Sequence, residues 1–510
     1  MITAITVLVA LGFLGWGFYR AIPFGKLGLV AWFQSVVLIA PWLLFFGLSI
    51  VGIYLNIVSV LFLFVLSTGL YIYLGNRLRS LAQTEALTRR ASAIAHAQDV
   101  SQPTTSDDSE NPADVTTAQT QATTADVQAS DIIPIPAEDL KAIQSIFGID
   151  TFFATETIPY QEGVILRGNL RGEADETIAR LSERLLEKVG VSETDPQQPR
   201  YRLFLVEGQD SKPVVIVLPS SRDPQPSTVF QKGVAVLLFL ATIAASLESG
   251  GLMLGFDFFT SPSRFAEVLP LATGILSVLI VHELGHWVLA RRYNIRLSLP
   301  FLIPTWQIGS FGAITRFESV LPNRNTLFDI AIAGPAAGGI LSLGMLVTGL
   351  LLSHKGSLFQ VPTEFFQGSI LVGTLTRVVL QESLQQSIVD VHPLVILGWL
   401  GLVITALNLL PAGQLDGGRI VQAIYGRKLA GRTTIASIVV LGLASIVNPL
   451  ALYWAIVVLF LQRELERPSQ NELTEPDDTR AALGLLALFL MIVTLLPLTP
   501  SLAGRLGIGS

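Results

Sequence analysis

Long apolar runs with at most one charged residue dominate the hydrophobic pattern of the chain. A helix needs roughly 20 residues to cross about 30 Å of hydrocarbon, and several runs reach that length. They are residues 2–19, the long run 29–75, which has room for two spans, and 233–254, 268–290, 330–352, 393–410, 434–461 and 481–498. The pattern therefore predicts a polytopic α-helical membrane protein with about eight to ten transmembrane helices.

The basic residues that flank these runs predict an orientation. Lys and Arg are retained on the cytoplasmic side of a membrane, and here they gather on alternate loops. The loops assigned to the cytoplasm carry Arg20, Lys26, Arg77, Arg79, Arg89, Arg90, Arg291, Arg292, Arg419, Arg427, Lys428 and Arg432, whereas the outer loops carry Arg264, Lys355 and Arg377. Residues 2–19 lack a basic leader and an Ala-x-Ala pattern, which favours a retained anchor over a cleaved signal. Asn448-Pro449 interrupts the run 434–461, so the side of the C-terminus stays open.

The polar stretches between the runs suggest the domain organisation. After the N-terminal transmembrane region 1–76, residues 77–130 begin basic, then become rich in Thr, Ser, Gln, Ala and Asp, which is typical of a linker. Residues 131–222 read as a small cytoplasmic α+β domain. Its expected elements are helices at 136–147 and 173–189 and strands at 163–167, 201–206 and 213–218. A membrane core at 230–462 and a C-terminal tail at 463–510 with a last transmembrane helix complete the chain.

Composition narrows the chemistry. The chain is 51% hydrophobic and 14% charged, against about 25% charged in soluble domains, which argues against an ordinary soluble enzyme. The net charge of −6 gives no reason to expect a nucleic-acid partner. With no cysteine and five histidines in the chain, disulfides and thiolate sites are impossible, and a metal would have to be held by His, Asp or Glu.

One apolar run carries polar side chains that are expensive at membrane depth. His282-Glu283-Leu284-Gly285-His286 lies within the run 268–290. Positions i and i+4 share a helix face, so both imidazoles can bind one Zn²⁺, with Glu283 placed beside them to accept a proton from the attacking water. The alternative is that both histidines are ordinary core residues. The rest of this helix is mostly Leu, Ile, Val and Ala, and such a helix would not carry two histidines and a glutamate without a functional reason.

A catalytic zinc uses three protein ligands, and two histidines leave it one short. Asp416 stands where Pro411 and glycines break a hydrophobic run, and broken helices at membrane depth line cavities or lie buried in protein. The basic pattern assigns it to the same membrane face as the histidines. Asp416 is therefore the candidate third ligand, although Asp-Gly-Gly is also common in plain turns.

The two motifs together resemble a known signature. His282-Glu283-x-x-His286 with Asn408-x-x-Pro411-x-x-x-x-Asp416-Gly417 is similar to the paired motif of the site-2 proteases, which are intramembrane zinc metalloproteases. Residues 307–315 resemble that family's membrane-dipping β-segment, and residues 334–338 its Gly-Pro helix. The α+β region resembles the cyanobacterial and chloroplast branch that includes the plant ethylene-dependent gravitropism-deficient and yellow-green proteins. The resemblance covers residues 135–500, and no segment resembles the PDZ module that many relatives carry.

The resemblance implies a function and a set of roles. It implies one Zn²⁺ per chain bound by His282, His286 and Asp416, with Glu283 as general base and Asn408 positioning or polarising the scissile carbonyl. The expected reaction is hydrolysis of a peptide bond within or next to a transmembrane segment of a membrane protein, in regulated intramembrane proteolysis. The expected location is the plasma or thylakoid membrane of a bacterium of cyanobacterial type, with the active site near the cytoplasmic face. The oligomeric state stays open.

The sequence also suggests roles for two other parts of the membrane core. Residues 307–315 are either an edge strand on which a substrate is held extended or a re-entrant loop that only packs the core. Gly334 and Gly338 are best explained by close helix packing.

Two other classes of function are compatible with polar groups in an apolar run. A metal transporter would need coordinating groups spaced across the bilayer, whereas the candidate ligands gather near one face. A zinc-binding scaffold that captures membrane helices without cutting them would not need the base Glu283. Metal flux in vesicles tests the transporter, and a wild type that binds zinc but cuts no tested helix would favour the scaffold.

Overall fold

The structure is a computed structural model that describes residues 2–50, scattered positions from 63 to 78, and residues 135–508 except 161–162, 193–197, 209–211, 306, 447 and 462–463. The chain divides into two units, Met1–Asp131 and Ile132–Ser510, and each is described by itself.

The first unit begins with a pair of helices. They are α1 (Ile2–Ala21) and α2 (Gly25–Ile50), joined by the 3-10 turn Ile22–Phe24. The indole N–H of Trp32 donates a hydrogen bond of 2.9 Å to the carbonyl of Leu14 and so ties the two helices together. Most of the second span expected in the run 29–75 lies outside the described residues, as does the linker expected at 77–130 apart from its first two positions.

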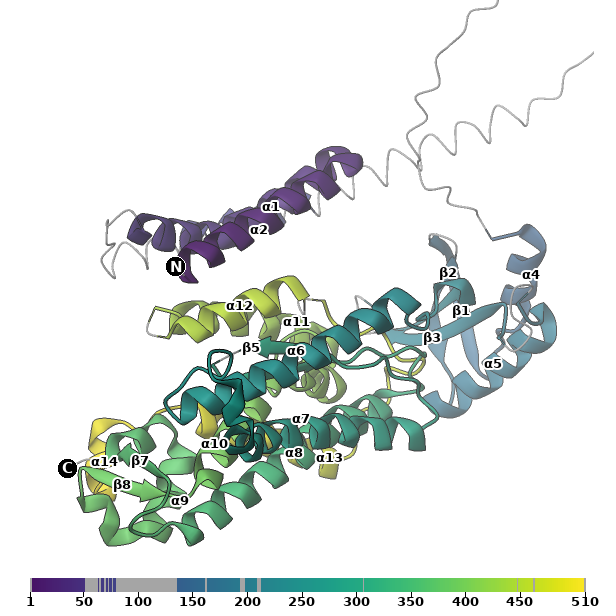
Figure 1. The fold of residues 1–510 in the computed structure, drawn as a ribbon. Helices are drawn as coiled ribbons and strands as arrows, with labels where there is room; N and C mark the ends of the chain where they lie inside the picture. Colours follow the sequence, from purple (N-terminus) through teal and green to yellow (C-terminus); the bar gives the residue numbers. More distant parts are fainter. Residues whose placement is uncertain are drawn as a thin grey trace, which may run out of the picture. The chain divides into compact units, whose positions relative to one another are not determined.

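The second unit opens with an α+β domain (Figure 1). Its elements are α4 (Ala137–Ser145), β1 (Phe152–Tyr160), β2 (Gly163–Leu170), α5 (Ala174–Val189), β3 (Tyr201–Glu207) and β4 (Pro213–Pro219). The strands form an antiparallel sheet in the order β1-β2-β4-β3. Helix α5 buries Leu181 and Leu185 against Leu166, Leu203 and Val215 of the sheet. The expected helices and strands are present, and β1 is an additional strand that the pattern did not indicate.

A membrane core follows the domain. Four helices of this unit are long and apolar enough to cross a membrane: α6 (Val229–Met253), α7 (Phe265–Arg292) with the preceding turn Pro262–Arg264, α8 (Arg324–Leu352) and α13 (Asp478–Leu495). Two apolar helices are shorter, α9 (Ile370–Leu380) and α10 (Pro393–Asn408). The described residues therefore support a polytopic membrane protein, with fewer full-length spans than the eight to ten expected.

The expected span 434–461 is divided in the structure. Helix α11 (Asp416–Ala444) is bent at Gly426, where φ is 79°, and α12 (Pro449–Leu461) begins after a break. Proline has no N–H and disfavours a helical conformation in the residue before it, so Asn448-Pro449 ends one helix and starts the next. Neither piece reaches the length of a full span within 434–461.

Small residues let the central helices approach closely. A Cβ on Gly285 of α7 would lie 2.4 Å from the carbonyl oxygen of Ala333 in α8. A Cβ on Gly398 of α10 would lie 2.3 Å from the backbone nitrogen of Leu346 in α8. Gly334 and Gly338 of α8 face α7 in the same way, which confirms the packing role expected for them.

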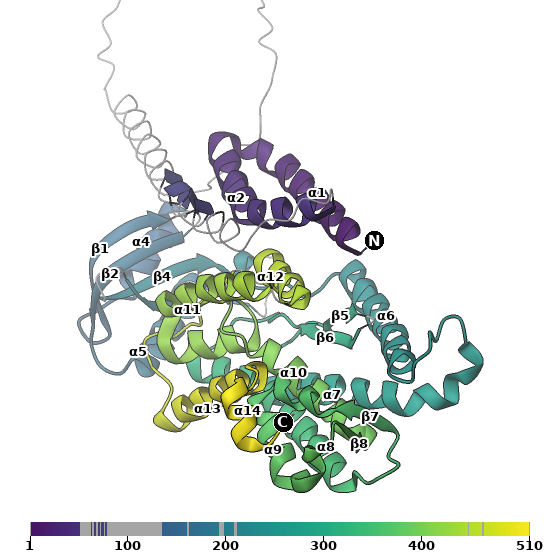
Figure 2. The same cartoon turned by 90° about the vertical axis from the view of Figure 1, so that its left-hand side faces the viewer.

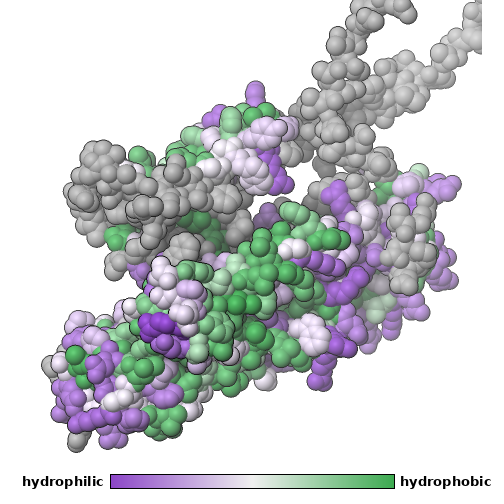
Figure 3. Space-filling model, viewed as in Figure 1, coloured by the Kyte–Doolittle hydropathy of each residue, from purple (hydrophilic) through white to green (hydrophobic). Residues whose placement is uncertain are grey.

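The hydrophobic surface of this unit lies over its long apolar helices. Figure 3 shows mostly hydrophobic residues over α6 and α7 and mostly hydrophilic ones over the α+β domain. Exposed apolar side chains on the two helices include Val236, Leu237, Leu240, Ile280, Leu284 and Trp287. An exposed apolar face of this extent on single helices is typical of contact with lipid.

A short hairpin lies among the helices of the second unit. Strands β5 (Phe301–Thr305) and β6 (Gly309–Ile314) pair antiparallel between α6 and the α11–α12 pair (Figure 2). Phe311 of β6 packs against Trp454 of α12, with ring centroids 5.5 Å apart. The hairpin leads directly to Thr315, which reaches the candidate site.

The chain between α8 and α10 packs against the C-terminal residues of the protein. It contains β7 (Phe359–Pro362), the 3-10 turns Thr363–Gly368 and Gln381–Gln385, α9 and β8 (Ile388–Val391). Phe366 and Val372 are buried there with Leu498, Ala503 and Ile508, which lie in and around α14 (Pro500–Leu506).

Residues 464–477, which we call the α12–α13 connector, join the α+β domain to the membrane core. The backbone N–H of Leu205 in β3 donates to the carbonyl of Gln470 at 2.7 Å, and the N–H of Glu472 donates to the carbonyl of Leu205 at 2.9 Å. On its other side, the N–H of Gln470 donates to the carbonyl of Leu321 at 2.9 Å. The connector therefore lies between β3 and the chain that enters α8.

Candidate metal centre

Two imidazoles meet on one face of α7. His282 and His286 are one helical turn apart and are only 6% and 4% exposed, and their Nε2 atoms lie 3.2 Å from each other. Gly334 of α8 makes room for them, because a Cβ there would lie 2.2 Å from Nε2 of His286. The close approach of α7 and α8 thus shapes the pocket in which the imidazoles sit.

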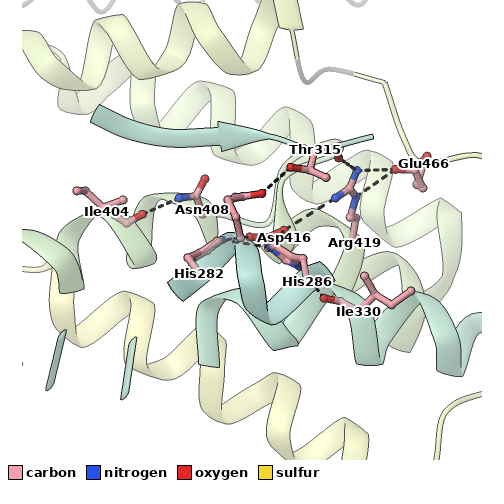
Figure 4. A network of polar contacts seen from close by, with 10 residues as sticks. His282, His286, Thr315, Ile330, Ile404, Asn408, Asp416, Arg419 and Glu466 are labelled. Carbon is pink, nitrogen blue, oxygen red and sulfur yellow. Dashed lines mark hydrogen bonds and ion pairs between the residues drawn. The ribbon is translucent and has the colours of Figure 1, made fainter. Parts of the chain in front are cut away.

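The ring of His286 is oriented by a backbone group. Its Nδ1–H donates to the carbonyl oxygen of Ile330 in α8 at 2.8 Å (Figure 4). A histidine that donates through one ring nitrogen presents the lone pair of the other, which is the usual arrangement of a metal ligand. Nε2 of His286 is therefore the free acceptor at the centre of the site.

Asp416 comes from the first turn of α11, far away in sequence. Its Oδ2 lies 3.1 Å from Nε2 of His282 and its Oδ1 lies 3.4 Å from Nε2 of His286. The sharp return of the chain before it depends on glycine, because a Cβ on Gly417 would lie 1.8 Å from the carbonyl oxygen of Leu409. The sequence Pro411 to Gly418 thus carries the carboxylate back to the imidazoles.

These three side chains fit a zinc ion. Ligands held about 2.0–2.1 Å from a tetrahedral zinc are separated from one another by about 3.3 Å. The two Nε2 atoms lie 3.2 Å apart, and each lies at a similar distance, 3.1 or 3.4 Å, from one of the two carboxylate oxygens of Asp416. Two neutral imidazoles and one carboxylate are also a donor set that zinc prefers. The residues therefore suit a three-ligand site that leaves a fourth position open.

Glu283 lies beside the three donors and is only partly buried. Its carboxylate and the two imidazoles offer ligating atoms that all lie within 4.8 Å of one another. The hydroxyl of Thr315 donates to Oε2 of Glu283 at 2.7 Å. This bond fixes the direction of the carboxylate while its other oxygen stays available.

Asn408 is the last residue of α10 and is 3% exposed. Its Nδ2 donates to the carbonyl of Ile404 at 3.0 Å, which leaves a second N–H on the same nitrogen. Gly312 of β6 packs directly on this amide, since a Cβ there would lie 2.4 Å from Nδ2, and its φ of 118° also favours glycine.

A small pocket connects these groups. Its volume is about 10 Å³, room for about one water. Its lining includes Glu283, His286, Thr315, Asn408, Asp416 and Arg419. All five predicted site residues, His282, Glu283, His286, Asn408 and Asp416, thus lie in one place.

The remaining histidines in the described residues lie elsewhere. The imidazole of His392 accepts a hydrogen bond from the N–H of Leu394 and caps α10, and His354 is exposed, with its Nδ1 3.0 Å from the carbonyl of Lys355. His96 lies outside the described residues.

Three residues of the site were not predicted as such. Arg419 was counted as a basic loop residue, but its side chain is only 6% exposed and binds Glu466 and the backbone of Thr315. Its position three residues after Asp416 on a helix was a usable signal, because such positions are neighbours on one face. Thr315 and Glu466 gave no comparable local signal.

Comparisons with known proteins match both parts of the second unit. The family model for peptidase family M50 matches residues 270–448, and the model for the EGY3 middle domain matches residues 141–226. The probable zinc metalloprotease EGY1 of Arabidopsis thaliana chloroplasts is 38% identical over 409 residues, covering 73% of each chain. EGY1 of Oryza sativa subsp. japonica is 37% identical, covering 74% of this chain and 70% of the relative. EGY2 of Arabidopsis thaliana is 37% identical, covering 73% of this chain and 67% of the relative. No solved structure matches the chain significantly.

Proposed function

Because the chain belongs to peptidase family M50, the site-2 protease family of membrane-embedded zinc metalloproteases, we propose that it hydrolyses a peptide bond within or next to a transmembrane segment of another membrane protein. Such cleavage releases part of a membrane protein and is a step in regulated intramembrane proteolysis. The single observation that carries this proposal is the position of Asp416, whose carboxylate lies 3.1 and 3.4 Å from two imidazoles on an apolar helix.

We propose that His282, His286 and Asp416 hold the zinc. The two Nε2 atoms and the nearer oxygens of the Asp416 carboxylate lie 3.1–3.4 Å apart, close to the spacing of ligands around a tetrahedral zinc. The hydrogen bond from His286 to Ile330 leaves the Nε2 lone pair for the metal. A zinc ion there would act as a Lewis acid on the scissile carbonyl and lower the pKa of water.

Glu283 is proposed as the general base. It must take a proton from water and later give it to the leaving amine, so its carboxylate has to face the pocket in a fixed direction. The hydrogen bond from Thr315 at 2.7 Å supports that orientation. Partial exposure leaves the carboxylate able to exchange protons with water that enters the pocket.

Asn408 is proposed to bind the scissile carbonyl. One N–H of its amide is engaged with Ile404, and the second is free to donate to the oxygen on which negative charge develops. Its burial and its contact with Gly312 hold the amide in place before the substrate arrives.

The β5–β6 hairpin is proposed to be a re-entrant membrane segment on which the substrate is held extended. A peptide bond inside a helix has its carbonyl engaged, so a transmembrane substrate must unwind before cleavage, and pairing with a strand would satisfy its freed backbone groups. Support comes from β6 itself, which packs on Asn408 through Gly312 and leads to Thr315 beside Glu283.

The domain arrangement and location are likewise proposed. Residues 131–222 would be a cytoplasmic domain beside the catalytic core 230–462, with 1–76 and the last helix in 463–510 anchoring the chain. The basic residues in the last turn of α7, Arg291 and Arg292, support a site that opens toward the cytoplasm. A plasma or thylakoid membrane of cyanobacterial type would then hold the protein; the relatives described above are chloroplastic.

Reconstitution with a single-span substrate tests the proposal. Wild-type protein in vesicles should cut the substrate, and Glu283→Gln should bind zinc with similar stoichiometry but lose at least about 100-fold in the cleavage rate, the lower end of the range for a general base. Glu464→Gln, an exposed glutamate in the α12–α13 connector, is the matched control and should cut normally. Unchanged cleavage by Glu283→Gln would exclude the proposed base.

A further inference from the structure

A buried arginine lies between a proposed zinc ligand and the residue that holds the proposed general base. Nη1 of Arg419 is 4.0 Å from Oδ1 of Asp416, and its Nη2 donates to the carbonyl oxygen of Thr315 at 2.7 Å. Thr315 in turn holds Glu283 through its hydroxyl. One guanidinium thus contacts a proposed zinc ligand and the residue that orients the proposed base.

The position of this arginine depends on Glu466. A buried guanidinium is costly unless it is paired, and Nε and Nη2 of Arg419 lie 3.1 and 2.9 Å from Oε2 of Glu466. The face of the guanidinium lies over the ring of Phe317, 4.7 Å from its centroid. Glu466 supplies the carboxylate that balances the charge of Arg419, because Asp416 is farther away and faces the imidazoles.

The position of Glu466 is tied to its neighbours through the backbone of the α12–α13 connector. Its backbone carbonyl accepts hydrogen bonds from Gln422 at 3.1 Å and from Arg427. Four residues later the same segment pairs with Leu205 of β3, as described above. The amide of Asn471 also donates to Asp175 of α5 at 2.5 Å, so the connector is attached to both a strand and a helix of the α+β domain.

We propose that Glu466 is a positioning residue for the metal site: through Arg419 it aligns Asp416 and Thr315, and through the connector it makes that alignment depend on the attachment of the α+β domain. The proposal rests on the proposed function for the identity of the ligands and the base. It assigns the α+β domain a regulatory part, in which loosening of its contact with the connector lowers zinc affinity and turnover together.

Metal binding tests the first half without any substrate. Glu466→Gln keeps the size of the side chain and removes its charge, and we expect zinc affinity to fall about 10- to 100-fold, the usual effect of losing a partner that orients a ligand. The absorption spectrum of the Co²⁺-loaded protein should change in shape, because the geometry at the metal changes. Glu464→Gln makes the same chemical change at an exposed position of the connector and should leave affinity and spectrum as in the wild type.

Kinetics and stability separate positioning from general damage. Glu466→Gln should lower kcat with little change in KM. Thermal unfolding of the metal-free protein is the control, and it should show that the variant is folded. If Glu466→Gln matches Glu464→Gln in zinc affinity, spectrum and kcat, the positioning role is wrong. Failure of the proposed function would appear differently, as a wild type that binds zinc but cuts no substrate, and the metal affinities would still decide the role of Glu466.

A double-mutant cycle tests the link to the α+β domain. Asp175→Ala removes the acceptor of the Asn471 bond, and we expect it to weaken zinc binding in the wild type but to have a much smaller effect in Glu466→Gln, because the two residues act through one path. Glu176→Ala, the exposed neighbour on α5, is the control. No effect of Asp175→Ala, or the same fold-change in both backgrounds, would overturn the link.

Discussion

At the scale of single residues, hydrogen bonds fix the orientation of the side chains in the candidate site. His286 is held by a backbone carbonyl of α8, Glu283 by a hydroxyl of the β5–β6 hairpin, and Asn408 by its own helix. Each bond uses one polar atom and leaves another facing the pocket. Preorganisation of this kind reduces the rearrangement that a reacting group must undergo.

Gly334 gives a test of this packing. Replacing it with alanine would place a methyl group 2.2 Å from Nε2 of His286, so Gly334→Ala should displace the imidazole, lower zinc affinity at least about tenfold and destabilise the fold by about 1–3 kcal/mol. Gly344→Ala is the matched control on the same helix, because a Cβ there meets nothing within 4 Å. Zinc titration and thermal unfolding of both variants measure the difference; equal behaviour would contradict the packing account.

At the scale of elements, the α12–α13 connector carries a partly buried acid. Burial raises the pKa of Glu472 above its ordinary value, an effect that the nearby Arg427 and Arg324 only partly oppose. Because the folded pKa lies above the unfolded one, folding favours the protonated acid. This contribution to stability is present at low pH and is lost as pH rises through the folded pKa.

Glu472→Gln should therefore change the pH dependence of stability. The variant cannot ionise at this position, so the difference between its melting temperature and that of the wild type should increase as pH rises above the ordinary pKa of glutamate and wild-type Glu472 becomes charged. Glu475→Gln, an exposed acid in the same connector, should run parallel to the wild type. Melting curves in detergent at several pH values measure this, and a constant offset for Glu472→Gln would exclude the effect.

Elements with a clear periodicity were predictable from the sequence, and those that depend on distant partners were not. The amphipathic pattern of α5 and the apolar runs of α6, α7 and α8 identify these helices directly. Strand β1 was missed because its polar residues and Pro159 obscure the alternation, and it is completed by pairing with β2. The sequence motifs indicated His282, His286 and Asp416 as the candidate metal ligands, whereas Glu466 lies 47 residues from its partner Arg419 and only the fold brings the two together.

At the scale of the whole molecule, the proposed zinc would link two distant parts of the chain, α7 and the start of α11. A ligand that binds only the folded state stabilises it, by about 2.7 kcal/mol at a free concentration of about 100 times Kd. Removing zinc with a chelator should therefore lower the melting temperature of the wild type.

The same chelator should leave Asp416→Asn unchanged, because that variant has lost the proposed third ligand. Asp478→Asn, an exposed aspartate at the start of α13, should respond as the wild type does. Loss of thermal stability on chelation in Asp416→Asn as large as in the wild type would show that zinc binds elsewhere.

The absence of cysteine from the chain makes the proposed membrane orientation easy to test. Single cysteines can be introduced at two exposed positions, Arg291 in the last turn of α7 and Lys355 after α8. A maleimide that cannot cross membranes should label Lys355→Cys from outside intact spheroplasts, and should label Arg291→Cys only after lysis. The reverse pattern would place the metal centre near the opposite face.

The pairing of β3 with residues 470–472 has a practical consequence for fragment design. A soluble fragment cut before α6 would lose that neighbour and leave one side of β3 open, and an unpaired edge strand invites self-association. A better-behaved fragment would fuse residues 468–474 behind β4 through a flexible linker, so that the segment bridged to Leu205 still covers the outer edge of β3.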